Sequence, residues 1–203
     1  MTVGTCLAAG AVVGAGLANT SEVPQRAEDA KPLKTGVKAP EVNLTSTDGK
    51  STALKQILGG KPSIVVFYRG GWCPFCNVQL ADLGKNETQI KAKGYQLVAV
   101  SPDMASELKK STDKNKLTYK LYSDSSAEAI KAFGVAFRVD DDTFNLYKNN
   151  YKLDLEKVAG GQTHHLLPVP SVFVIDAKGV IKYVYSNPDY RVRLKGEDLL
   201  KAL

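Results

Sequence analysis

Two cysteines with two residues between them, Cys73 and Cys76, are the side chains of this sequence best suited to covalent chemistry. They follow an apolar run at 63–68 and open a stretch with helical spacing of apolar residues. At a helix N-terminus, free N–H groups and the positive dipole end lower a thiol pKa from about 8.5 toward roughly 4–7. We therefore expect Cys73 to be the exposed nucleophile, and Cys76, one turn later, to form a short-loop disulfide with it.

Three residues around the cysteines fit this role. Trp72 would shield one side of the first sulfur, and Arg69 could add positive potential. Pro74 suits the first turn of a helix, where its missing N–H is not needed. The sequence therefore predicts a strand–helix junction built around a reactive thiolate.

Two other interpretations of the cysteine pair remain open. A structural zinc site needs a second pair of ligands, for which only Cys6, His164 and His165 are available. Alternatively, both cysteines could be packing residues of an ordinary helix.

The elements that must position these residues indicate an α/β protein with a mixed sheet, because apolar runs alternate with helical patterns. The chain begins with a predicted β-hairpin, whose strand 40–44 leads into a turn at 47–49. Residues 138–166 show no clear spacing of apolar residues and are interpreted as an insertion, called the excursion below, with a short helix at 143–150. The predicted strands lie at 63–68, 97–100, 119–122, 172–175 and 180–185, and the helices at 73–94, 104–115, 126–133 and 196–203.

The segment 67–77, Phe-Tyr-Arg-Gly-Gly-Trp-Cys-Pro-Phe-Cys-Asn, resembles the peroxiredoxin-like branch of the alkyl hydroperoxide reductase/thiol-specific antioxidant (AhpC/TSA) family of the thioredoxin superfamily. The likeness extends over roughly 37–203. It implies a thioredoxin-like fold, with a central mixed sheet flanked by helices and an N-terminal hairpin. It also implies that Cys73 attacks a disulfide or a peroxide and that Cys76 resolves the product. The redox-active disulfide would be the only redox group, and a thioredoxin-like protein would serve as reductant.

The same resemblance assigns a role to Val169 and Pro170, which precede the strand at 172–175. In thioredoxin-like folds a cis-proline at this place faces the cysteine pair and offers backbone groups to an extended substrate. A trans-proline that merely opens the strand is the alternative.

Two departures from the family pattern bear on the substrate. Peroxiredoxins carry a threonine three residues before the reactive cysteine, where this chain has Gly70, and an arginine before the late strand, where it has Pro170. Both groups stabilise the transition state of peroxide reduction. We therefore expect disulfide exchange to be faster than peroxide reduction.

A copper-delivery protein of the same superfamily is the alternative function. Such proteins bind Cu(I) through two cysteines and a distant histidine, and His164 or His165 could join Cys73 and Cys76 in that way. Their cysteines are separated by three residues rather than two, which counts against this alternative.

The N-terminal part differs in composition from the rest of the chain. Residues 6–18 are apolar or small, too short to span a bilayer, and typical of the apolar core of a signal peptide. We expect 1–18 to be a signal-peptide remnant, 19–36 a linker and 37–203 the redox domain, exported to a bacterial periplasm or cell envelope. The net charge of +6 comes from scattered lysines without an arginine-rich stripe, which argues against nucleic acid as a partner.

Overall fold

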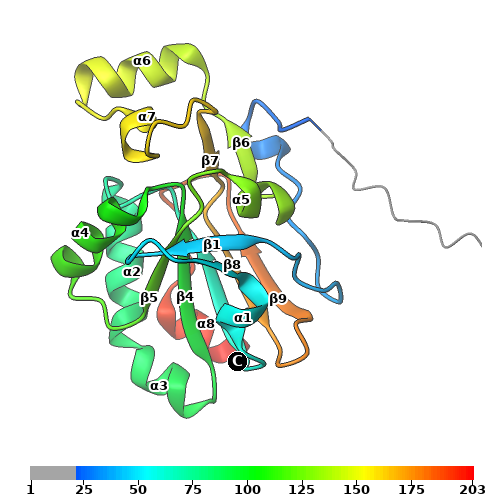
Figure 1. Cartoon of the computed structure of the whole chain (residues 1–203). Coiled ribbons are helices and arrows are strands. Elements are labelled where there is room, and N and C mark those ends of the chain that lie inside the picture. Colours follow the sequence, from blue (N-terminus) through cyan, green and yellow to red (C-terminus); the bar gives the residue numbers. More distant parts are fainter. Residues whose placement is uncertain (1–21) are drawn as a thin grey trace, which may run out of the picture.

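A seven-stranded mixed sheet forms the centre of the computed structural model, which describes residues 22–203 (Figure 1). The predicted signal-peptide remnant and Cys6 lie outside the described residues. The strand order is β2-β1-β5-β4-β3-β8-β9. Strands β3, β4 and β5 are parallel, whereas β8 runs antiparallel to both β3 and β9. A separate antiparallel pair consists of β6 and β7.

The strands are β1 Asn43–Ser46, β2 Ser51–Ala53, β3 Ser63–Phe67, β4 Gln96–Ser101, β5 Lys120–Ser123, β6 Ala136–Arg138, β7 Leu166–Pro168, β8 Ser171–Ile175 and β9 Ile181–Ser186. The helices are η1 Ala27–Asp29, α1 Leu54–Leu58, α2 Pro74–Lys85, α3 Glu87–Ala92, α4 Ala105–Asn115, α5 Glu128–Ala132, α6 Asp141–Asn150, α7 Leu155–Val158 and α8 Gly196–Ala202. None of the described helices is both long enough and apolar enough to cross a membrane.

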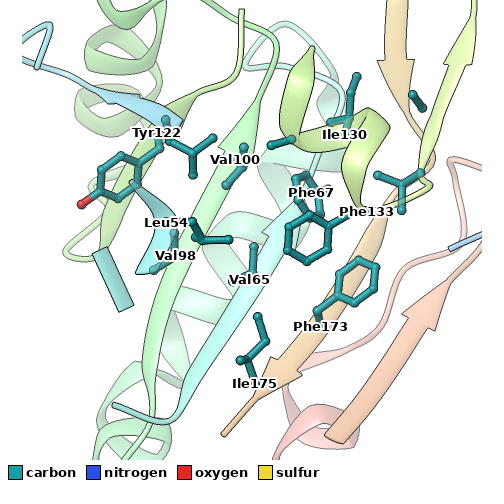
Figure 2. Close-up of a cluster of buried hydrophobic side chains, with 14 of the residues drawn as sticks. Leu54, Val65, Phe67, Val98, Val100, Tyr122, Ile130, Phe133, Phe173 and Ile175 are labelled. Atoms are coloured by element: carbon teal, nitrogen blue, oxygen red, sulfur yellow. The ribbon is translucent and has the colours of Figure 1, made fainter. Parts of the chain in front are cut away.

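Helices cover both faces of the sheet, as the unbroken apolar run of β3 predicts. Val65 and Phe67 point to one face and pack with α1 and α5. Ile64 and Val66 point to the other, where α2, α3, α4 and α8 lie. On the first face the rings of Phe67, Phe133 and Phe173 lie together, with centroids 4.8–5.8 Å apart (Figure 2).

The hairpin and the central elements confirm the sequence prediction, with one difference. Strands β1 and β2 pair antiparallel around the predicted turn. The helix predicted over 73–94 is divided into α2 and α3 at Asn86, whose backbone (φ −92°, ψ 0°) ends one helix and begins the next.

The excursion at 138–166 is more regular than its sequence suggests. Helices α6 and α7 lie beyond one end of the sheet, in yellow in Figure 1. Asp140 caps α6 by accepting a 2.8 Å hydrogen bond from Thr143 N. Val139, Phe144, Leu155 and Leu167 form a small core there. The three-residue strands β6 and β7, which flank the excursion, were not predicted because they are too short to show a period.

Residues 22–36, which composition suggests are a linker, lie against the domain. Leu33 N donates to Phe133 O at 3.0 Å, and Arg138 N donates to Pro24 O at 2.8 Å. Val23 and Leu33 pack on the core. These few apolar side chains and backbone hydrogen bonds hold a segment that is otherwise polar.

We predict that Gly134→Ala destabilises the protein far more than Gly179→Ala. Both glycines have positive φ, +69° and +80°, which costs alanine about 1–2 kcal/mol. Only at Gly134 would the new Cβ overlap a backbone atom, Lys31 O, whereas nothing lies within 4 Å at Gly179. Urea unfolding should show that Gly134→Ala lowers the free energy of unfolding by about 1–3 kcal/mol more than Gly179→Ala does. Equal losses would contradict the packing of 22–36 against the domain.

Candidate active site

The cysteine pair lies where β3 ends and α2 begins. Cys73 is the N-cap of α2, with extended backbone (φ −83°, ψ 117°), and Pro74 is in the first helical turn. Cys73 N donates to Gly70 O at 3.1 Å, and Asn77 N donates to Cys73 O at 3.1 Å. The predicted strand–helix junction is therefore present, with Cys73 at the helix N-terminus.

The two thiols have opposite electrostatic environments. The pKa of Cys73 is lowered to about 6, first because its sulfur accepts a hydrogen bond from the Cys76 thiol, and further by the Cys76 N–H and the charges of Arg69 and Arg193. The pKa of Cys76 is raised well above the usual range by burial and by its role as donor to Cys73. Cys73 is thus the thiolate and Cys76 holds the proton.

Cys73 is nevertheless not exposed, contrary to the sequence prediction. The two cysteines are 1% and 0% exposed. Both belong to the core cluster on the α2 face of the sheet, so Cys73 is not open to solvent in this conformation.

Arg193 lies beside the two sulfurs and was not identified in the sequence analysis. Its Nη2 lies 3.3 Å from Cys76 Sγ and 3.9 Å from Cys73 Sγ. The guanidinium is held by Gln79 Oε1 at 3.0 Å and by Tyr190 O at 2.6 Å. Arg193 therefore supplies a fixed cation at the sulfurs, although Pro170 occupies the place where the family carries its arginine. No motif marks it, because it lies 120 residues after Cys73.

Arg69 contributes a second cation from the end of β3. It is 5% exposed, and its Nη2 donates to Tyr147 OH at 2.6 Å. Its Cζ lies 4.3 Å from the ring centroid of Tyr190 and 5.1 Å from that of Trp72. The prediction that Arg69 adds positive potential to Cys73 agrees with this arrangement.

A crowded turn precedes Cys73. Gly71 N donates to Asp103 Oδ2 at 2.7 Å, and burial raises the pKa of Asp103 to about 7. A Cβ on Gly70 would overlap Trp72 Nε1 and lie 2.7 Å from Asp103 Oδ1. The threonine that peroxiredoxins carry here therefore has no room. Asp103 follows β4 at the same edge of the sheet as Cys73, which is the one sequence signal that could have marked it.

Of the two residues predicted to face the substrate, only Pro170 lines a cavity. Val169 is 1% exposed, and its N–H and carbonyl are bonded to Val135 O and Ser171 Oγ. No cis peptide bond occurs in residues 22–203, so the 169–170 peptide is trans.

The histidines are engaged away from the thiols. His164 Nε2 donates to Ser125 O at 2.8 Å and its Nδ1 accepts from Leu166 N at 2.9 Å. His165 stacks on Phe144 and lies 2.9 Å from Glu156 Oε1. Within the described residues no three potential ligands cluster around a metal position. The copper-delivery alternative therefore has no support, and within residues 22–203 a zinc site at Cys73 and Cys76 has none either; Cys6 lies outside that range.

Comparison with known proteins finds one matching family and several proteins of similar sequence or fold. Residues 35–184 match the AhpC/TSA family. The chain is 29% identical to peroxiredoxin Bcp of Escherichia coli K12 over 156 residues, which cover 77% of this chain and 87% of that protein. Reduced Prx3 of Vibrio vulnificus in complex with hydrogen peroxide has a similar fold, with a TM-score of 0.68 at 18% identity over 84% and 95% of the two chains. Peroxidoxin BcpB of Mycobacterium tuberculosis gives a TM-score of 0.63 at 20% identity over 84% and 96%.

We predict that iodoacetamide modifies Cys73 before Cys76, with a rate that rises with pH to a plateau and has its midpoint near pH 6. The rate rises with pH because the Cys73 thiol loses its proton near its lowered pKa, and the thiolate stays populated above that pH. Arg193→Gln should shift the midpoint upward, because a cation near the sulfurs is lost. Arg191→Gln, an exposed neighbour paired with Asp189, should leave it in place. Mass spectrometry of the quenched protein identifies the modified residue, and earlier labelling of Cys76 would contradict the assignment.

Proposed function

The chain belongs to the AhpC/TSA family of thiol-dependent antioxidant oxidoreductases, and on this basis we propose that it reduces peroxides and disulfides through a reversible Cys73–Cys76 disulfide. The observation that carries the proposal is the contact of one cation, Arg193, with two sulfurs whose pKa values are shifted in opposite directions. That arrangement holds a nucleophile and a resolving thiol in adjacent positions.

The peroxide half-reaction follows from these protonation states. The Cys73 thiolate attacks the terminal oxygen of a hydroperoxide, the O–O bond breaks, and the alkoxide leaves as an alcohol after it takes a proton. The thiolate becomes a sulfenic acid and the peroxide is reduced by two electrons. Cys76 then loses its proton and attacks the Cys73 sulfur. This step forms the disulfide and releases the sulfenic hydroxyl with a proton as water.

We propose that a thioredoxin-like protein returns the disulfide to the dithiol. One of its thiolates attacks the disulfide, and its second thiol resolves the mixed disulfide, so that two electrons pass to this chain. The exposed side chains of Phe75 and Val78, in the first turns of α2, support a protein partner at this surface. Within this chain, the two cysteines carry the redox chemistry of the proposed cycle.

We predict that disulfide exchange is faster than peroxide reduction. Arg193 replaces one of the two groups that peroxiredoxins use, but Gly70 leaves the threonine hydroxyl absent, and one such contact is worth about 10²–10³ in rate. The single tryptophan, Trp72, directly precedes Cys73, so stopped-flow fluorescence should report both reactions.

The Cys76→Ser variant tests the division of labour. It should trap a mixed disulfide on Cys73 with a small disulfide probe, whose second sulfur leaves as a thiol, and accumulate sulfenic acid slowly under dilute hydrogen peroxide. Cys73→Ser should do neither. Oxidation of Cys73 by micromolar peroxide within milliseconds would contradict the preference for disulfides.

We also propose that the protein acts outside the cytoplasm, because the apolar segment 6–18 is typical of a signal peptide. N-terminal sequencing of the protein isolated from its native cell envelope should then give a start near Asn19. Recovery of the intact chain from the cytosol would contradict export.

A further inference from the structure

We propose that the cavity next to Arg69 binds the carboxylate of an organic hydroperoxide, so that the preferred peroxide is an anionic, partly apolar molecule. The cavity has a volume of about 310 Å³ and is bordered by Arg69, Tyr147, Tyr190, Pro170 and Phe137. This inference rests on the proposed peroxide chemistry and names its substrate class.

The first support is the unpaired charge of Arg69. Arg69 is 5% exposed, and the partners of its guanidinium are the Tyr147 hydroxyl and three aromatic rings. None of the ion pairs in the described part of the chain includes it, and its Nε has no hydrogen-bond partner there. Its charge acts on the Cys73 thiolate, but no carboxylate of the described residues pairs with it, which is costly for a buried cation. The planar guanidinium fits a carboxylate, which it can bind through two parallel hydrogen bonds.

The second support is the remaining wall of the cavity. Phe137, Val139, Pro170 and Pro188 contribute apolar surface. The lining also includes Arg26 and Arg138, and two acids, Glu28 and Asp140. With Arg69, three arginines stand against two carboxylates, so the wall carries a net positive charge. A volume of about 310 Å³ is far larger than hydrogen peroxide requires, since one water occupies about 30 Å³ of liquid. The wall therefore matches a carboxylate attached to an apolar body.

Tyr190 connects this cavity to the sulfurs. Its ring lies over Arg69, packs edge-on against Phe75 of the cysteine motif at 5.7 Å, and its carbonyl holds Arg193. The charge of Arg69 also acts on Cys73. A substrate held by its carboxylate at Arg69 thus contacts the residues that border the reactive sulfur. Such remote binding energy can orient the O–O bond where the threonine is absent.

The test compares two hydroperoxides that differ in one group. One is cumene hydroperoxide, and the other is the derivative that carries a carboxylate at the para position of the ring. We expect the reduced wild-type protein to react with the carboxylate at least about tenfold faster, a difference of 1.4 kcal/mol. Arg69→Gln should abolish this preference, and Arg69→Lys should restore part of it. Arg191→Gln, which removes the same charge from a neighbouring exposed position, should preserve it. The ratio of the two rates is independent of the fraction of Cys73 thiolate, and far-UV circular dichroism reports whether each variant is folded.

A second measurement separates this inference from the proposed function. Iodoacetate is anionic and iodoacetamide is neutral. The ratio of the rates at which they alkylate Cys73 therefore compares an anionic with a neutral probe without using a peroxide. A ratio that falls in Arg69→Gln but not in Arg191→Gln supports the anion site even if both hydroperoxides react slowly. Equal rates for the two hydroperoxides in the wild type, with an alkylation ratio unchanged by Arg69→Gln, would overturn the anion site while leaving the cysteine chemistry intact.

Discussion

The active site depends on one constraint, the burial of β3 on both faces and between two neighbouring strands. Its partners fix the register: Phe67 lies opposite Val100 of β4 and Ser171 of β8. The C-terminal end of β3 therefore brings Arg69 and Cys73 to the edge of the sheet that Asp103 and Pro170 also reach. Because loops at the ends of buried strands are held by the sheet, side chains distant in sequence meet here with defined geometry.

The chemistry of the site comes from an asymmetry between two similar side chains. A helix N-terminus alone would favour either thiol as an anion, but Cys76 lies one turn deeper, where desolvation dominates. The proton therefore resides on Cys76, which donates it to Cys73 as a hydrogen bond. Arg193 and Arg69 act on the resulting charge from separate elements. The resting state thus holds both the charged nucleophile and the proton that resolution must release.

Patterns within short stretches of the sequence predicted the strands, the helices and the cysteine pair, because these features depend on neighbouring residues. Short apolar runs identified β3, β4 and β8, and the spacing of Cys73 and Cys76 identified the reactive pair. Arg193 and Asp103 escaped because their roles arise from tertiary contacts, and the exposure of Cys73 was misjudged for the same reason. The excursion carrying α6 and α7 showed no period because it buries only a small core of its own. Its Tyr147 nevertheless reaches Arg69, a contact that no motif suggests.

The turn at Gly70 has a consequence for how this site can change over evolutionary time. Its backbone (φ +154°) and its missing side chain leave space that Trp72 and Asp103 occupy from two different elements. A hydroxyl-bearing residue at position 70 would be tolerated only after both neighbours had become smaller or had moved. Asp103 in turn anchors Gly71, so its loss alone would loosen the loop. The three positions are therefore epistatic, and the path from this site to one with a threonine passes through intermediates less stable than either end.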